Sequence, residues 1–386
     1  MRCCSRGWDG CTATLVRMVG FLKKEVNAVE PLNSPETAHQ LLEALADRQP
    51  LSRQPVAILS GGGWLLNRHA LTMQQLLAMP PEDAASLIIS NYQEARSDIL
   101  WAAPGSGSRI LSALGAKVKF NPHGPAETLE PLIKTEADLD AIDRSRIDQE
   151  TQLAGIREIT RSIAQKAAGA YYVAAGMWGP LTMAGLLCGI EALSRFMYRN
   201  KALAHSIIDF TADLYLYFMA GYRAAGVDLL WMAEPTASGD MISLRIFEEF
   251  ALPALQKVYD AIARDYRTAP TAAGTGGRVL TGLHICGNTQ DRLHRIPTAG
   301  LDILSVDYKV SLKNARAILE DRIILAGNVN PVDICYESPH LVAEESLRCI
   351  ADAQGGAFLL MPGCDVPPAT PMANIQAMAN AASGSL

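Results

Sequence analysis

The stretch Val279-Leu280-Thr281-Gly282-Leu283-His284-Ile285 is one of eight short, mostly apolar runs in this chain. Each run is continuous rather than alternating, which suits strands of a parallel sheet that is buried on both faces. Segments with helical spacing separate the runs, so strands and helices alternate as they do in parallel α/β folds. The runs are Val56 to Leu59, Ile99 to Ala102, Tyr171 to Ala175, Leu229 to Ala233, Val279 to Ile285, Ile303 to Val306, Ile323 to Ala326 and Phe358 to Met361.

Eight such units predict a closed (β/α)8 TIM barrel, with an open doubly wound sheet as the alternative. We assign residues 34–386 to one catalytic barrel domain and expect helical insertions within residues 103–165. Residues 1–33 show no clean period and are expected to form a disordered N-terminal arm, in which Met1 and Met18 are both candidate start residues. The active site of a barrel lies at the C-terminal ends of its strands, so the residues that close each run are the functional candidates.

Composition and charge exclude several classes of protein. The chain has 386 residues, of which 49% are hydrophobic, enough for a large core. A net charge of −6 leaves no basic surplus for binding nucleic acid. Residues 167–190 carry no charge, but Gly176, Gly179 and Pro180 interrupt them, so we expect no membrane span. Eight cysteines without a paired repeat favour the reducing cytoplasm.

The strongest chemical signal is the sequence His284-Ile285-Cys286 at the end of the fifth run. Residues two apart on an extended chain point to the same face, so His284 and Cys286 can share one ion. The last run ends at Gly363-Cys364, which places a second thiol at the barrel mouth. One histidine and two cysteines are the ligands expected of a zinc site whose fourth position stays open. For each of these residues taken singly, the alternative to metal binding is a role in packing.

Four further polar residues close runs or follow them. Glu234 is a candidate catalytic residue, as a fourth metal ligand, as a partner of a ligand or as a plain hydrogen-bond acceptor. Asp307 and Asp240 are candidates to orient His284 through its other ring nitrogen. Asn328 lies in the loop after the seventh run, where barrels often bind anions, and a tight structural turn is the equal alternative there. Asn328 and Asp240 are therefore the candidate cofactor-binding residues.

Several motifs together resemble the uroporphyrinogen decarboxylase superfamily, and they look most like its methylcobamide:coenzyme M methyltransferase branch. The match runs in order from roughly Thr37 to Ala382. The motifs are Gly179-Pro180-Leu181-Thr182, Ala233-Glu234-Pro235-Thr236-Ala237-Ser238-Gly239-Asp240, His284-Ile285-Cys286-Gly287-Asn288-Thr289, Ser305-Val306-Asp307, Gly327-Asn328-Val329-Asn330-Pro331, and Gly363-Cys364 through Thr370-Pro371.

This resemblance implies a (β/α)8 barrel, which the strand pattern predicts independently. It also implies that His284, Cys286 and Cys364 bind Zn²⁺, and that the enzyme transfers a methyl group from a methylated corrinoid to a small zinc-bound thiol such as coenzyme M. The chain lacks the Asp-x-His-x-x-Gly motif that supplies the lower ligand of cobalt in fused corrinoid modules. A separate corrinoid protein is therefore the implied partner, and the corrinoid is a co-substrate that this chain does not bind stably.

The motifs depart from the family pattern at the barrel mouth. The family commonly has Asp-Pro at Glu234-Pro235 and Asn-Val-Asp-Pro at Asn328-Val329-Asn330-Pro331. True decarboxylases carry an Arg-Gln-Ala-Gly-Arg loop after the first strand, but here the loop is Ser60-Gly61-Gly62-Gly63-Trp64, which argues against a porphyrin substrate. The alternatives are a decarboxylase of the uroporphyrinogen type, zinc-dependent alkyl transfer from an epoxide to a thiol, and a non-catalytic subunit that sequesters a corrinoid or thiol.

Overall fold

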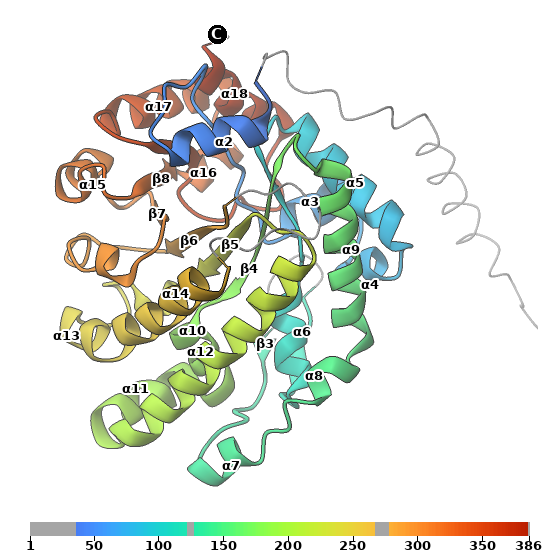
Figure 1. The fold of residues 1–386 in the computed structure, drawn as a ribbon, viewed down its shortest axis with the longest axis vertical. Helices are drawn as coiled ribbons and strands as arrows, with labels where there is room; N and C mark the ends of the chain where they lie inside the picture. Colours follow the sequence, from blue (N-terminus) through green and yellow to red (C-terminus); the bar gives the residue numbers. More distant parts are fainter. Residues whose placement is uncertain (1–35, 122–126, 267–277, 385–386) are drawn as a thin grey trace, which may run out of the picture.

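The computed structural model describes residues 36–121, 127–266 and 278–384. Its centre is a seven-stranded parallel sheet, around which the helices are arranged (Figure 1). The strands follow one another in chain order, β1-β4-β5-β6-β7-β8-β9. Their bounds are β1 Ile99–Trp101, β4 Tyr172–Trp178, β5 Leu229–Ala233, β6 Leu280–Ile285, β7 Ile303–Val306, β8 Ile324–Val329 and β9 Phe358–Pro362.

The segment around Val56 fills the eighth strand position. Val56 forms a parallel bridge with Leu360 of β9. On its other side, the carbonyl of Val56 accepts a hydrogen bond of 2.8 Å from the amide of Asp98, the residue before β1. This segment joins the two edges of the sheet, and the predicted (β/α)8 barrel is confirmed. The strand order never reverses, which rules out the doubly wound alternative.

Two tryptophans fill the barrel interior beneath the end of β6. The rings of Trp101 and Trp231 meet edge to face with centroids 5.1 Å apart. Trp231 is paired in register with Gly282, where an added Cβ would lie 2.2 Å from Cε3 of that ring. His284 is two residues beyond Gly282 and points to the same face. The aromatic pair therefore forms a floor one layer below His284.

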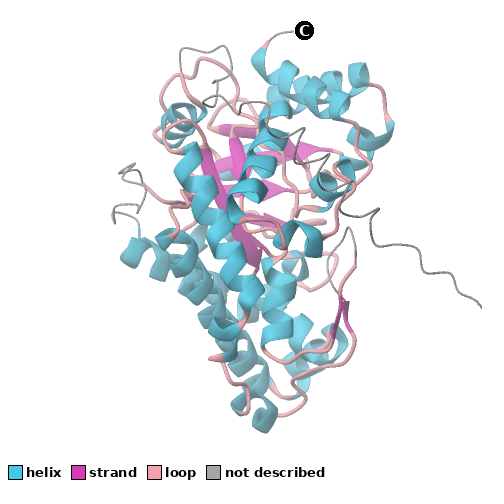
Figure 2. Ribbon diagram, turned by 90° about the vertical axis from the view of Figure 1, so that its right-hand side faces the viewer, coloured by secondary structure: helices cyan, strands magenta, loops and turns pink. Residues whose placement is uncertain are grey.

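Helices cover the outside of the strands on both sides (Figure 2). The helices of nine residues or more are α2 Ala38–Ala46, α5 Pro81–Glu94, α9 Thr151–Ala167, α10 Pro180–Cys188, α11 Ile190–Arg199, α12 Lys201–Ala224, α14 Leu252–Tyr266, α17 Pro339–Asp352 and α18 Met372–Ser383. The shorter ones are α3 Gly63–Arg68, α4 Met73–Leu77, α6 Ser106–Ala113, α7 Glu136–Asp140, α8 Arg146–Gln149, α13 Leu244–Ile246, α15 Leu312–Leu319 and α16 Pro331–Tyr336, with single turns at Pro235–Ala237, Phe247–Ala251 and Ile296–Ala299.

The predicted insertion at residues 103–165 lies only partly outside the barrel. Its first part contains α6, α7, α8 and an antiparallel pair of strands, β2 Val118–Lys119 and β3 Glu127–Thr128. Its last part, α9, packs on α5 and β4 within the barrel layer. Ile156, Ile159 and Ile163 repeat at helical spacing in α9 and are buried, which explains why this helix belongs to the core.

The structure bears on one further expectation from the sequence. Within the described ranges, no helix is both long and apolar enough to cross a membrane. The predicted N-terminal arm at residues 1–33 lies outside the described residues.

Candidate metal centre

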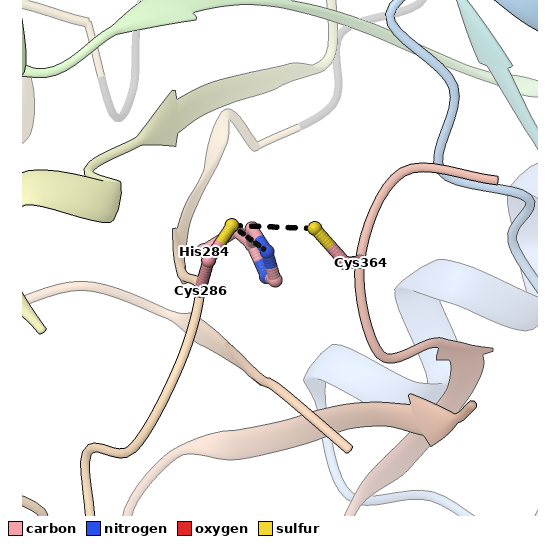
Figure 3. Close-up of side chains that lie close together, drawn as sticks. All are labelled: His284, Cys286 and Cys364. Atoms are coloured by element: carbon pink, nitrogen blue, oxygen red, sulfur yellow. Dashed lines mark hydrogen bonds between the residues drawn. The ribbon is translucent and has the colours of Figure 1, made fainter. Parts of the chain in front are cut away.

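The three predicted metal ligands come together at the C-terminal mouth of the barrel. His284 lies near the end of β6, Cys286 follows that strand, and Cys364 follows β9 (Figure 3). Nε2 of His284 is 3.1 Å from Sγ of Cys286, and the two Sγ atoms are 3.3 Å apart. One ligand atom from each residue lies within 4.8 Å of the other two. The spacing of these atoms allows one metal ion to bind all three.

Hydrogen bonding favours a thiolate in this cluster, against the opposing effect of burial. His284 is 2% exposed, and the two cysteines are half-buried. The hydrogen bond from Cys286 lowers the pKa of Cys364 to about 4, with a further contribution from His284. The same contact, together with burial, raises the pKa of Cys286, so the proton that the pair shares stays on Cys286. The thiolate is the form of cysteine that binds metal ions.

Ser305 sets the orientation of the His284 ring. The two residues are paired in register on β7 and β6, and Ser305 is fully buried. Oγ of Ser305 lies 3.0 Å from Nδ1 of His284. When this hydroxyl accepts the Nδ1 proton, Nε2 keeps a free lone pair on the side of Cys286. The structure thus places Ser305, rather than Asp240 or Asp307, against the second ring nitrogen.

Asp307 and Asp240 instead fasten the turn that follows Cys286. Asp307 accepts a hydrogen bond of 2.7 Å from the amide of Gly287. Asp240 forms a salt bridge of 3.0 Å with Lys309, which lowers the pKa of Asp240. Gly287 has a φ of 78°, and an added Cβ would lie 2.5 Å from Oδ2 of Asp240. The two carboxylates and this glycine therefore position the loop that carries Cys286.

Glu234 follows β5 and anchors the start of α10. Its carboxylate accepts hydrogen bonds from the amides of Leu181, at 3.0 Å, and Thr182, at 2.7 Å, and from the Thr182 hydroxyl. Gly179 makes room for it, because an added Cβ would lie 2.2 Å from Oε2. Burial raises the pKa of Glu234 to about 7, against the opposing effect of these hydrogen bonds. Of the roles left open by the sequence, the structure shows the hydrogen-bond acceptor.

Asn328 uses its side chain on the neighbouring loop. Its Nδ2 donates hydrogen bonds to the carbonyl oxygens of Asp307, at 3.0 Å, and Val310, at 2.7 Å. Sγ of Cys349 lies 3.6 Å from its Oδ1. The side chain thus holds the segment between β7 and α15. Anion binding by the loop that contains Asn328 stays a prediction.

Two mouth residues that sequence reasoning missed fasten other loops. The fully buried Arg292 donates to the carbonyl oxygens of Ala237, at 2.6 Å, and Ile242, at 3.0 Å. The carboxylate of Asp365 accepts a hydrogen bond of 2.7 Å from the amide of Gly61. The position of Asp365 directly after a candidate ligand cysteine was an available signal. The partners of Arg292 are far away in sequence, and no local pattern marks it.

The fold and the site define a TIM-barrel protein with a potential His/Cys/Cys metal centre at its mouth. The family model for uroporphyrinogen decarboxylase (URO-D) matches residues 34–384, so the chain belongs to this family and the predicted resemblance is confirmed. The methylcobamide:CoM methyltransferase MtbA of Methanosarcina mazei is 28% identical over 250 residues, which cover 65% of this chain and 69% of that protein. The uroporphyrinogen decarboxylase of Serratia proteamaculans is 26% identical over 280 residues, which cover 70% and 75%.

A solved structure supports the same fold. A methyltransferase from Methanosarcina mazei superposes with a TM-score of 0.78 at 21% sequence identity. The match covers 90% of this chain and 99% of the other one. At this level of identity, the structural similarity establishes the barrel fold. The reaction has to be argued from the residues of the site.

Proposed function

We propose that this protein is a zinc-dependent enzyme that transfers a methyl group from a methylated corrinoid, free or on a separate protein, to a small thiol such as coenzyme M. The observation that carries the proposal is the approach of Nε2 of His284 and the Sγ atoms of Cys286 and Cys364 to within 4.8 Å of one another. Imidazole and thiolate are preferred ligands of zinc, and three of them leave one tetrahedral position for a substrate. The similarity to proteins named methylcobamide:CoM methyltransferases also supports it.

The orientation and protonation of the three donor residues suit zinc, as does their composition. Ser305 keeps Nε2 of His284 directed toward the sulfur atoms. Hydrogen bonding favours the thiolate of Cys364. The half-buried cysteines lie at the mouth, above the floor formed by Trp101 and Trp231. The mouth is therefore the side from which a substrate thiol would approach the open position.

When bound, zinc would coordinate the substrate thiol and keep it deprotonated at neutral pH, which makes its sulfur nucleophilic. The neutral imidazole of His284 and the two cysteine thiolates balance the charge of the ion, so the substrate sulfur keeps its electron density. The buried Ser305 and the turn fastened by Asp307 hold these ligands in place. In the proposed transfer, a bond would form between the substrate sulfur and the methyl carbon, and the carbon-cobalt bond of the corrinoid substrate would break with its electron pair left on cobalt as Co(I).

The mouth disfavours the decarboxylase alternative. The loop at residues 60–64 lacks the arginines that would hold the carboxylates of a porphyrinogen. In their place, the carboxylate of Asp365 binds the amide of Gly61. A poly-anionic tetrapyrrole therefore lacks a favourable binding surface on this side.

Metal content tests the proposal, with the purified full chain, the variants His284→Ala and Cys364→Ser, and Cys335→Ser as a control outside the cluster. We expect about one zinc ion per chain in the wild type and the control, and its loss in both ligand variants. The zinc-loaded protein should methylate coenzyme M with methylcobalamin as donor. Absence of zinc after reconstitution, or full activity of Cys364→Ser, would overturn the proposal. Turnover of an epoxide without transfer from methylcobalamin would favour the alkyl-transfer alternative.

A further inference from the structure

A groove of about 900 Å³ opens between α11 and the loop after β5. α11 follows β4 through α10, and residues 236–242 follow β5. Both walls therefore lie at the C-terminal end of the barrel, where the metal centre is. The groove has its own lining and includes none of the three candidate metal ligands. Its volume is that of a site for a sizeable organic molecule.

Both walls of the groove are held in place by buried side chains. The guanidinium of Arg292 donates to the carbonyl oxygens of Ala237 and Ile242, at the two ends of the loop wall. Leu193 and Met197 are the buried residues of α11, which packs against α10 and α12. The groove is therefore preformed, which reduces the entropic cost of binding a ligand there.

The surface of the groove is apolar and exposed. Ile190 is 48% exposed, Tyr198 is 60% exposed and Met241 is 49% exposed, and all three line the groove. Large apolar side chains gathered in one concave place on a surface mark a binding site more often than scattered ones do. These three side chains offer a flat aromatic ring and two aliphatic contacts to an apolar ligand edge.

Arginines border the same surface. Arg195 and Arg199 line the groove beside a single acidic residue, Glu191. Arg245 lies over the ring of Tyr198, with its Cζ 5.9 Å from the centroid. Among the residues that the structure describes, none of these three arginines forms a salt bridge. In a chain with a net charge of −6, this group is a local concentration of positive charge.

One loop separates the groove from the metal centre. The amide of Gly239 donates a hydrogen bond of 2.7 Å to the carbonyl of Asn288, in the turn after Cys286. An added Cβ on Gly287 would lie 3.4 Å from Cβ of Ser238. The inner side of the loop thus packs on the segment that carries a metal ligand, while its outer side forms a wall of the groove. A large ligand that crosses this loop would contact both sites.

We propose that this groove binds the corrinoid substrate, with its apolar residues against the edge of the macrocycle and with Arg195 and Arg199 on the phosphodiester of the nucleotide tail. The inference rests on the proposed function. The thiol is small and is held at the metal centre, so the corrinoid is the reactant whose size suits the groove. A cobamide carries one strong anion, its phosphodiester, and the planar guanidinium is well suited to bind phosphate.

The test compares methylcobalamin with methylcobinamide, which lacks the nucleotide tail and its phosphodiester. Equilibrium dialysis gives the affinity of the zinc-loaded full chain for each probe. The double variant Arg195→Ala with Arg199→Ala should bind methylcobalamin at least about tenfold more weakly and should bind methylcobinamide as the wild type does. Met241→Ser should weaken both complexes. Arg264→Ala, an exposed arginine that pairs with Asp265, is the matched control and should change neither affinity.

The outcomes separate this inference from the proposed function. Equal losses for the two probes, no loss for either, or a wild type that binds neither would overturn the assignment of the groove. Methyl transfer from methylcobinamide to coenzyme M does not depend on the phosphodiester. If that transfer is absent while the double variant still discriminates between the two probes, the proposed reaction fails and the corrinoid-binding groove stands.

Discussion

Ser305 and His284 face each other across β7 and β6, with Oγ of the serine 3.0 Å from Nδ1 of the imidazole. The contact joins residues 21 positions apart and exists because the register of two neighbouring strands places them opposite each other. It connects the barrel wall directly to the metal centre, since Nε2 of the same ring faces Cys286. The orientation of the candidate ligand ring is thus set by the sheet itself.

Replacing Ser305 with alanine should weaken zinc binding without removing a ligand. We expect the zinc affinity to fall by about 10- to 100-fold, because the ring loses the group that holds its orientation and tautomer. Competition with a chelator measures this change. Ser346→Ala is the matched control, since Ser346 is also fully buried but donates to a helix carbonyl in α17. Equal zinc affinities in Ser305→Ala and wild type would show that the hydroxyl has no part in the centre.

Replacing Gly287 with alanine should disturb the turn beside Cys286. The residue has a φ of 78°, and the new Cβ would lie 2.5 Å from Oδ2 of Asp240. Strain of this kind costs on the order of 1–3 kcal/mol, and the displaced turn should also lower the zinc affinity. Urea unfolding measures the loss of stability.

Gly169→Ala separates the two causes of that loss. Gly169 has a similar φ of 73°, but an added Cβ there meets nothing within 4 Å. This control should lose stability through backbone strain alone and should keep its zinc. If Gly287→Ala loses no more free energy of unfolding than Gly169→Ala and the two variants bind zinc equally well, the contact between the turn and Asp240 is not tight.

The barrel and the three candidate ligands were accessible from the sequence because each leaves a local signal. Continuous apolar runs mark the strands, and His284 and Cys286 share a face through a spacing of two. Contacts across the fold leave no such signal. The role of Arg292 depends on carbonyl groups 50 and 55 positions away, and that of Ser305 depends on strand register.

The same limit explains the partial error in the predicted insertion. A polar outer face and an apolar inner stripe occur in α9 as in any surface helix. Whether such a helix packs on the barrel or on an appendage depends on contacts with α5 and β4, which the local sequence does not encode. Roles of mouth residues such as Glu234 and Asn328 were open for the same reason, since their partners lie on other loops.

Asp228, the residue directly before β5, should make stability depend on pH. Burial raises its pKa to about 6; the amide of Val173 and the positive charges of His39 and Arg223 oppose the rise, and Glu43 adds to it. The folded state therefore holds the proton more tightly than the unfolded chain does. This contribution is fully present below the pKa of the unfolded carboxyl and is lost as the pH rises through about 6.

Asp228→Asn removes this titration and keeps an acceptor for the amide of Val173, which lies 3.0 Å from the carboxylate. Relative to wild type, the free energy of unfolding of the variant should rise by roughly 2 kcal/mol between about pH 4 and pH 7. Urea unfolding at both pH values measures the difference. A difference between variant and wild type that stays constant over this range would contradict the raised pKa.

Glu234→Ala distinguishes an anchor of α10 from a fourth metal ligand. The change leaves the amides of Leu181 and Thr182 without their buried acceptor, so we expect a loss of about 3 kcal/mol in the free energy of unfolding. Zinc content should be unchanged, because the amide of Glu234, not its side chain, bonds to the carbonyl of His284. Thr182→Val, which removes only the hydroxyl donor, should lose about 1 kcal/mol. A variant of full stability that has lost its zinc would instead identify Glu234 as a ligand, with α10 held by other contacts.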